Sequence, residues 1–193
     1  MNALDRSFYQ RGTVDVARDL LGKVLVHGPA AGIIVETEAY LGGDDLASHS
    51  AAGITDRTRV IFGPPGHAYV YLSYGMHECL NIVAEPDGKA GCVLIRALEP
   101  IEGLDIMRAR RPKARTDRDL TSGPGKLTRA LAITRAHNGL DLTQSDLTQG
   151  DLIVRRHDAV RAFQIDVSPR IGIAKCVDLP LRFTVKGNRF ISR

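Results

Sequence analysis

The chain has 193 residues, a length that fits one domain with a buried hydrophobic core. Hydrophobic residues make up 44% and charged residues 25%, which excludes a disordered chain, and no apolar run reaches the roughly 18 residues of a membrane span. The net charge of +4 mildly favours a polyanionic partner. The N-terminus lacks the apolar centre of a secretory signal, and three cysteines are an odd number, so we expect a cytoplasmic protein.

Apolar spacing and turn residues predict a few helices and several short strands. Helical spacing predicts helices over 13–21, around 103–111 and directly after Ser122. We expect Thr13 to cap the first helix and Gly22 to end it. Alternating or continuous apolar runs predict strands over residues 23–27, 32–40, 92–100, 150–157, 170–175 and 181–187.

The rest of the chain predicts a hairpin and a long loop. The aromatic-rich run over 68–83 is typical of two strands joined near Tyr74 and Gly75. Residues 41–66 are rich in Gly, Asp, Ser and Pro, and an irregular segment of this length is more often functional than incidental. Because no repeat or linker divides the chain, we expect a single compact domain over 1–193 of mixed α/β (α+β) class, with helices flanking a largely antiparallel sheet.

The run VETEAY places Glu36, Glu38 and Tyr40 on one face of a strand, because alternate side chains of a strand point the same way. Carboxylates are costly to bury without partners, so an edge strand that faces water explains them equally well. Their position favours a site, since the strand leads into the long loop that carries His49, and such junctions commonly hold functional residues. A carboxylate whose pKa is raised by burial could act as a general base.

Tyrosines gather in the predicted hairpin, although aromatic residues are only 5% of the chain. Tyr69 and Tyr71 would share a strand face, and Tyr74 would lie beside the turn. A hydrophobic cross-strand cluster explains Tyr69 without any function. For Tyr71 and Tyr74 the alternative is a pocket wall and an exposed wedge, the parts needed by a protein that unstacks and holds a base.

Two basic features are candidates for phosphate contacts. Residues 108–118 carry six basic side chains against one acid, a pattern that alone indicates a solvated helix end and loop. The run SGPGKL lacks the residues of a Walker phosphate loop, but it predicts a glycine-flanked helix start at which Lys126 could bind one phosphate. The histidines show no ligand-like spacing, so we expect neither a metal nor a cofactor.

Seven runs that cover almost the whole chain match one known family in their order. They are ARDLLGKVLV, IVETEAYLGGDDLASHS, GPPGHAYVYLSYGM, CLNIV, CVLIRALEPIEG, SGPGKLTRALAI and PLRFTVKG. In this set the sequence resembles the alkyladenine (3-methyladenine) DNA glycosylase family, and the combination of ETEAY, ASHS, YVYLSYGM and RALEP is highly specific. The resemblance implies a compact mixed α/β domain without a helix-hairpin-helix element, and an enzyme that removes damaged bases from DNA.

The resemblance also implies roles for single residues. Glu38 matches the general base that activates the attacking water, Arg96 matches the arginine that helps to hold this water, and Glu36 falls at a position that we interpret as structural. The basic features gain weight as contacts to the DNA backbone, which position a protein without reading sequence. The candidates for these contacts are Lys126, Arg108, Arg110 and Arg111.

The base pocket follows from the same resemblance. Tyr40 and Tyr71 match the aromatic walls that stack on a flipped base, and His49 matches a hydrogen-bond partner beside it. Tyr74 matches the residue at a hairpin tip that enters the minor groove and fills the gap. Asn81 matches the pocket residue that discriminates against the amino group of guanine. His77 departs from the resemblance, because some relatives have an aromatic residue at this position.

Together these features predict a monofunctional DNA glycosylase of base excision repair. It would flip alkylated or deaminated purines from the duplex and hydrolyse the N-glycosidic bond with a water activated by Glu38. We expect double-stranded DNA with damaged purines as its partner, no membrane, and a monomer. Three alternatives stay open: a non-catalytic DNA-binding domain, a bifunctional glycosylase and lyase with an amine nucleophile, and a metal-dependent hydrolase that uses His49 with Asp44 or Asp45.

Overall fold

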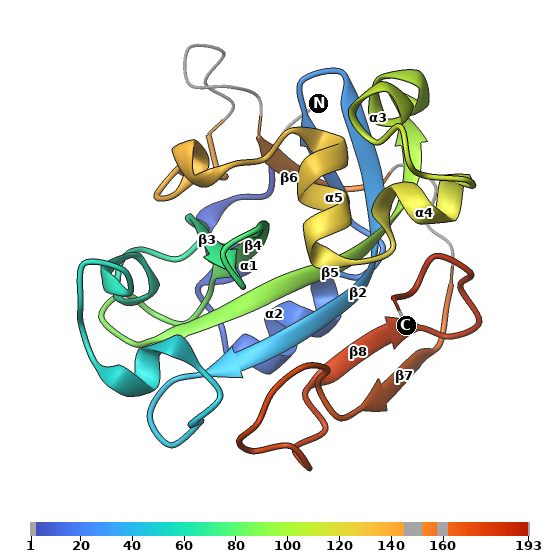
Figure 1. The fold of residues 1–193 in the computed structure, drawn as a ribbon. Helices are drawn as coiled ribbons and strands as arrows, with labels where there is room; N and C mark the ends of the chain where they lie inside the picture. The colour runs from blue at the N-terminus through green and yellow to red at the C-terminus, as the bar shows by residue number, and fades with distance from the viewer. Residues whose placement is uncertain (1–2, 145–151, 158–161, 193) are drawn as a thin grey trace.

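An antiparallel sheet that curls around a hydrophobic core organises the protein in the computed structural model, which describes residues 3–144, 152–157 and 162–192 (Figure 1). The strands are β1 (Val24–His27), β2 (Ala30–Leu41), β3 (Ala68–Ser73), β4 (His77–Val83), β5 (Gly91–Glu102), β6 (Ile153–Arg155), β7 (Ile165–Ser168) and β8 (Arg182–Val185). The α-helices are α1 (Arg6–Tyr9), α2 (Thr13–Leu20), α3 (Leu104–Arg110), α4 (Asp117–Thr121) and α5 (Pro124–Leu131). Three short 3₁₀ helices, η1 (His49–Ala52), η2 (Arg59–Phe62) and η3 (Arg135–His137), complete the described elements.

The sheet has the strand order β3-β4-β5-β2-β1-β6, and β8 pairs with both β2 and β7. Every pair of neighbouring strands is antiparallel, so the predicted α+β class with a largely antiparallel sheet is confirmed. The long strands β2 and β5 cross the middle of the molecule side by side (Figure 1). No helix in the described part of the chain is long and apolar enough to cross a membrane.

Two local predictions are wrong, and each has a physical reason. Thr13 is the first residue of α2 rather than its cap: Gly12 holds the cap position, and the Thr13 backbone N–H and hydroxyl both donate to Glu85. Residues 170–175 form no strand, because Arg170 turns inward to a buried ion pair instead of joining the sheet. The expected long loop over 41–66 contains η1 and η2, and the segment before β6 lies partly outside the described residues.

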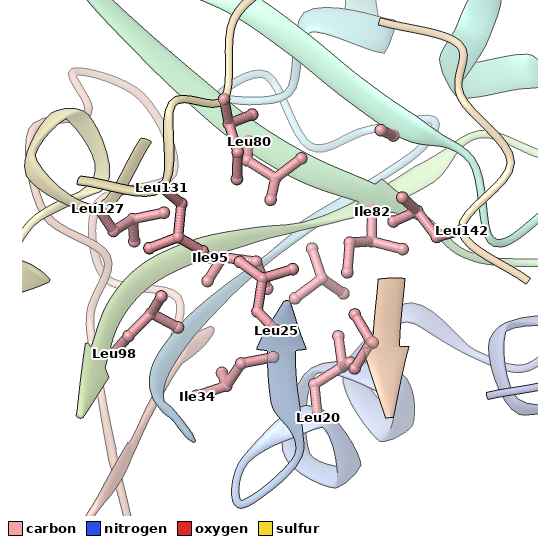
Figure 2. Packing of buried hydrophobic residues seen from close by; sticks show 14 of the residues in the cluster. Leu20, Leu25, Ile34, Leu80, Ile82, Ile95, Leu98, Leu127, Leu131 and Leu142 are labelled. Carbon is pink, nitrogen blue, oxygen red and sulfur yellow. The ribbon is translucent and has the colours of Figure 1, made fainter. Parts of the chain in front are cut away.

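The hydrophobic core lies on one face of the sheet. Side chains from α2, α5 and the long strands meet there, and Figure 2 shows Leu20, Ile34, Ile95 and Leu127 among them. Burying a Leu or Ile side chain of this kind contributes about 1.5–3 kcal/mol to stability. This packing fixes the central strands rigidly, so that their opposite face can carry polar groups.

Two register shifts in the β2–β5 pair prepare that opposite face. Ile34 pairs with Leu98, Glu36 with Ala97, and Thr37 with Ile95, so each strand carries one extra residue within this short stretch. Bulges of this kind re-aim side chains and are common beside active sites. Because of the extra residue between Ile34 and Glu36, the core-facing positions of β2 change from even-numbered to odd-numbered residues. Glu36, Glu38 and Tyr40 therefore all lie on the face away from the main core.

Candidate active site

A cavity of about 630 Å³ opens on the face of the sheet away from the core. It brings together six of the residues that the sequence predicts for the site, from β2, β3, β4, β5, η1 and the hairpin tip. They are Tyr40, His49, Tyr71, Tyr74, Asn81 and Arg96. Residues far apart in the chain meet here because β5 lies between β2 and β4 in the sheet.

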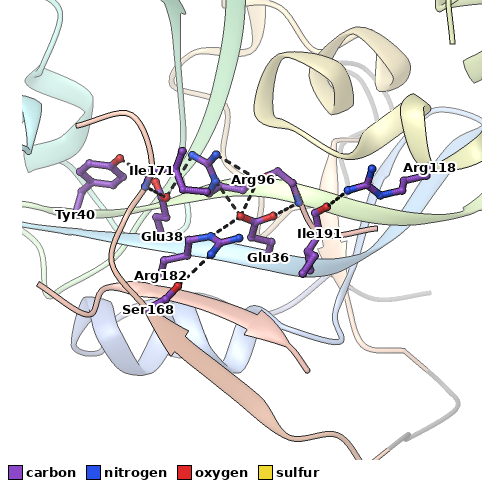
Figure 3. A network of polar contacts seen from close by, with 10 residues as sticks. Glu36, Glu38, Tyr40, Arg96, Arg118, Ser168, Ile171, Arg182 and Ile191 are labelled. Carbon is purple, nitrogen blue, oxygen red and sulfur yellow. Dashed lines mark hydrogen bonds and ion pairs between the residues drawn. The ribbon is translucent and has the colours of Figure 1, made fainter. Parts of the chain in front are cut away.

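Glu38 does not itself line this cavity, but the three partners that hold its carboxylate do, and Figure 3 shows them around it. The Tyr40 hydroxyl donates to Glu38 Oε2 at 2.9 Å, the Ile171 backbone N–H donates to Oε1 at 2.8 Å, and an Arg96 terminal nitrogen lies 3.3 Å from Oε1. The Glu38 side chain is 0% exposed. Burial raises the pKa of Glu38, and the Arg96 charge is the strongest of the effects that oppose this rise.

Glu36, on the same face, is surrounded by donors (Figure 3). Arg96 Nε and Arg182 Nε donate to Oε1 at 3.0 and 2.7 Å. The Ser192 backbone N–H donates to Oε2 at 2.6 Å and its hydroxyl to Oε1 at 2.8 Å. The interpretation of this pair as water-facing residues of an edge strand does not hold, because β2 is central and both carboxylates are buried.

Aromatic rings form the walls of the cavity. The His49 and Tyr71 rings meet edge to face with centroids 4.6 Å apart, and Tyr69 and Tyr71 lie 5.5 Å apart on the same strand face. His49 Nδ1 is 2.9 Å from the Tyr69 hydroxyl. Tyr40 lines the cavity from β2, and the Arg170 guanidinium lies 4.6 Å from its ring centroid.

Arg170 ties the loop after β2 to the segment that covers Glu38. Its guanidinium donates to both carboxylate oxygens of Asp45 at 2.7 and 2.8 Å and to the Ala39 carbonyl at 3.0 Å. Both side chains of this ion pair are buried. Since Ile171 follows directly, the pair positions the backbone N–H that donates to Glu38.

The β3–β4 hairpin ends in a tight turn at Tyr74 and Gly75. Both residues have positive φ, 50° and 69°, and the Met76 N–H donates back to the Ser73 carbonyl. A left-handed conformation is common for glycine and strained for tyrosine. Tyr74 is 84% exposed, so this strain is held at an outward-pointing aromatic side chain.

Asn81 lines the cavity from β4 and is almost completely buried. Its side-chain amide donates to the Tyr69 carbonyl on the neighbouring strand at 3.3 Å, and the Cys92 thiol donates to its oxygen at 3.8 Å. These contacts fix which end of the amide faces each neighbour. Asn81 therefore joins the hairpin strands and faces the cavity at the same time.

A basic groove of about 990 Å³ runs from the hairpin to α4 and α5. It is lined by the hairpin-tip residues and by a group of basic side chains, Arg111, Arg118, Lys126 and Arg129. His77 packs against Gly125, where an added Cβ would lie 2.9 Å from the His77 Cβ, so the hairpin and the start of α5 are in close contact.

The other two basic candidates make contacts within the protein. Arg108 forms ion pairs with Asp105 and Asp117 at 2.7 and 2.9 Å. Arg110 donates to the Ala130 carbonyl in the last turn of α5 at 3.0 Å. Neither lines the groove.

Sequence reasoning missed several residues of the site. Arg170, Arg182 and Ile171 come from the C-terminal segment, and Arg57 comes from the loop between η1 and η2. Lys175, an exposed residue, also lines the cavity, so an amine lies at the site that no local pattern indicated. The only local pattern that could have pointed to Arg57 is the ASHS run, because it marks the loop that carries both His49 and Arg57.

The arrangement has the features of a hydrolytic active site. A buried carboxylate with a raised pKa lies beside an arginine and beneath an aromatic cavity, where a water and a planar group could be held together. Within the described residues no group of three or more His, Cys, Asp or Glu side chains is arranged to hold a metal ion.

Comparison with known proteins defines the family. The model of the family described as Methylpurine-DNA glycosylase (MPG) matches residues 7–189. A protein of Methanocella arvoryzae is 51% identical over 200 residues, which cover 100% of this chain and 97% of the relative. Relatives from Methanoculleus marisnigri and Koribacter versatilis are also 51% identical, over 98% of this chain and 98% and 92% of their own lengths.

The names of these three relatives provisionally assign them as 3-methyladenine DNA glycosylases. The protein is therefore a hydrolase of the DNA glycosylase class. It belongs to the methylpurine-DNA glycosylase family.

Proposed function

We propose that this chain is a monofunctional DNA glycosylase whose single catalytic domain hydrolyses the N-glycosidic bond of alkylated or deaminated purines. The observation that carries the proposal is Glu38, a buried carboxylate with a raised pKa whose three partners all line the aromatic cavity. Membership of the family supports DNA as the substrate. The relatives' names support 3-methyladenine as one of the bases released.

In the proposed reaction a water attacks C1′ of the damaged nucleotide, and the bond between C1′ and the purine nitrogen breaks. Glu38 takes a proton from this water, and Arg96, which contacts Glu38 at 3.3 Å, helps to orient it. The electron pair of the broken bond stays on the purine. A purine alkylated on a ring nitrogen carries a positive charge and so leaves as a neutral base, whereas hypoxanthine needs a proton or a hydrogen bond.

The reacting base must leave the duplex to reach this cavity. Tyr40 and Tyr71 are the proposed stacking walls, and His49, which meets the Tyr71 ring edge to face, is the proposed hydrogen-bond partner. Electron-rich rings favour cationic or electron-poor purines. Asn81 would exclude guanine by leaving its exocyclic amino group without a partner.

The hairpin tip and the basic groove support a complex in which the DNA lies along the groove with the hairpin tip at the flipped base. Tyr74 is exposed and held in a strained turn, as a side chain that fills the gap left by a flipped base requires. Lys126 and Arg111 line the groove beside it and are the proposed backbone contacts. Arg108 and Arg110 are engaged within the protein and carry less of this role.

The decisive experiment incubates the protein with duplexes that each carry one 7-methylguanine, hypoxanthine or ethenoadenine, followed by alkaline cleavage at abasic sites. We expect release of at least one of these bases in the presence of a chelator. Borohydride should trap no covalent complex. A trapped complex that disappears in Lys175→Ala would make the enzyme a bifunctional lyase instead, and binding without release of any base would favour the non-catalytic alternative.

A further inference from the structure

Arg57 places a guanidinium on an aromatic wall of the cavity. Its central carbon lies 5.2 Å from the centroid of the Tyr71 ring, and Arg57 itself lines the cavity. A terminal nitrogen of the same guanidinium lies 3.3 Å from His49 Nε2. Arg57 therefore contacts both the ring and the imidazole that form this side of the cavity.

The Arg57 contact determines the state of His49. A guanidinium can only donate hydrogen bonds, so His49 Nε2 must accept and carries no proton. The neutral ring then has its proton on Nδ1, which donates to the Tyr69 hydroxyl at 2.9 Å. Burial and, secondly, the Arg57 charge lower the pKa of His49, in agreement with a neutral ring. The positive charge on this wall is therefore that of Arg57.

The three guanidinium groups of the cavity region differ in their counter-charges. Arg96 contacts Glu36 and Glu38, and Arg170 is paired with Asp45. Among the described residues, Arg57 has no carboxylate within ion-pair distance. Its charge is the least compensated of the three.

We propose that Arg57 is a specificity-determining residue that weakens the preference of the aromatic walls for cationic purine lesions relative to neutral ones. The inference rests on the proposed function, because it assumes that a flipped purine stacks in this cavity.

The physical reason is competition for one aromatic face. A cation over a ring is attracted by its quadrupole, and the Tyr71 ring already carries one. A cationic purine must displace the guanidinium or accept a like charge beside it, so it gains little from this wall. A neutral purine must also displace the guanidinium from the ring, but it is not repelled by the positive charge of Arg57. Removing the guanidinium should thus help cationic lesions more than neutral ones.

The test compares Arg57→Gln with Arg59→Gln. Both arginines are exposed and lie two residues apart, so both changes remove one positive charge from the same segment, but Arg59 pairs with Asp56 at 3.0 Å and does not line the cavity. Single-turnover excision at limiting enzyme is measured on duplexes with cationic 7-methylguanine and with neutral hypoxanthine. We expect Arg57→Gln to raise the ratio of the first rate to the second by about three- to tenfold, the size of one cation–π contact. Arg59→Gln should leave it within about twofold.

An unchanged or lower ratio in Arg57→Gln overturns the proposal, including the case in which both rates fall together because Arg57 binds a phosphate. NMR titration of the His49 imidazole gives a second readout: its pKa should rise in Arg57→Gln and stay at the wild-type value in Arg59→Gln. No rise would mean that the guanidinium does not act on this wall, which also overturns the proposal.

Failure of the proposed function gives a different result. If the wild-type protein excises no lesion, binding of cationic 1-methyladenosine and neutral inosine to the two variants decides the charge preference without catalysis. A preference that Arg57→Gln leaves unchanged would then overturn the inference.

Discussion

Glu36 and Glu38 lie two residues apart on one face of β2 and share Arg96, yet their other partners differ. Glu36 accepts from two arginines and from both donors of Ser192. Glu38 has one arginine contact at 3.3 Å, one backbone N–H and the Tyr40 hydroxyl. Of the partners of Glu36 only Arg96 lines the cavity, whereas all three partners of Glu38 line it.

This difference supports a structural role for Glu36 and the proposed reactive role for Glu38. A carboxylate that accepts from four donors, two of them on arginines, holds its neighbours in place. A buried carboxylate with few donors has a raised pKa and gains from accepting a proton. The same strand thus supplies the anchor of the site and its proposed base.

The largest effect is expected from Glu38→Gln. The amide keeps the shape and loses the proton acceptor, so single-turnover excision should fall by about 10²–10⁴-fold while lesion binding is retained. The pKa of Glu38 is higher in the folded than in the unfolded chain, so ionising it costs stability as the pH rises through the folded value. The melting temperature of the variant at neutral pH should accordingly equal or exceed that of the wild type.

Glu99→Gln is the matched control, because Glu99 is a β5 carboxylate that pairs with Asn188 and lies outside the cavity. It should keep nearly full activity. Excision by Glu38→Gln at the rate of this control would remove Glu38 from the proposed mechanism.

Glu36→Gln should act on stability instead. The change leaves Arg96 and Arg182 without their shared buried carboxylate oxygen, and losing one partner of a buried ion pair typically costs about 3–5 kcal/mol. Urea unfolding measures this loss. The sequence alone suggests that Glu36→Gln would be a mild control for Glu38→Gln. The ion pairs of Glu36 show that it would not be. A variant that is as stable as the wild type and inactive would reverse the assignment of the two acids.

Arg96 touches both acids, so its removal links the two regions. The Arg96 charge lowers the pKa of Glu38 against the rise caused by burial, and Arg96→Gln should raise this pKa further. Since the proposed reaction needs the ionised carboxylate, the acid limb of the pH–rate profile should move to higher pH. Arg182→Gln is the control, because Arg182 contacts Glu36 and not Glu38. An acid limb at the same pH in Arg96→Gln and Arg182→Gln would contradict the predicted effect of the Arg96 charge on the pKa of Glu38.

The sequence predicts the common face of Glu36, Glu38 and Tyr40, because strand alternation is local and the register shift between Glu36 and Thr37 places its extra residue on β5. It also predicts the hairpin with its turn at Tyr74. These features depend on neighbours in the chain.

The partners of the two acids could not be predicted in this way. Arg182 and Ser192 reach Glu36 across 146 and 156 residues of sequence, and Ile171 reaches Glu38 across 133. The segment 170–175 reads as a strand because its apolar residues alternate, and only the buried pair of Arg170 with Asp45 shows why it turns inward. Long-range ion pairs have no local sequence pattern.

The smallest effect is expected from Tyr40→Phe, which sharpens the comparison by removing one donor from Glu38 and none from Glu36. The Tyr40 hydroxyl donates to Glu38 Oε2 at 2.9 Å, and this bond lowers the pKa of the carboxyl. Phenylalanine keeps the ring over Arg170 and the proposed stacking wall. We expect the excision rate at neutral pH to change by less than about tenfold, the size of one hydrogen bond, and the acid limb to move to higher pH. Tyr71→Phe is the control, because it also removes a tyrosine hydroxyl from a proposed stacking wall, but this hydroxyl makes no hydrogen bond to Glu38. It should leave the acid limb in place. A loss in Tyr40→Phe as large as that of Glu38→Gln would show that the hydroxyl itself takes part in the chemical step, and that the reactive region extends from the carboxylate to the aromatic wall.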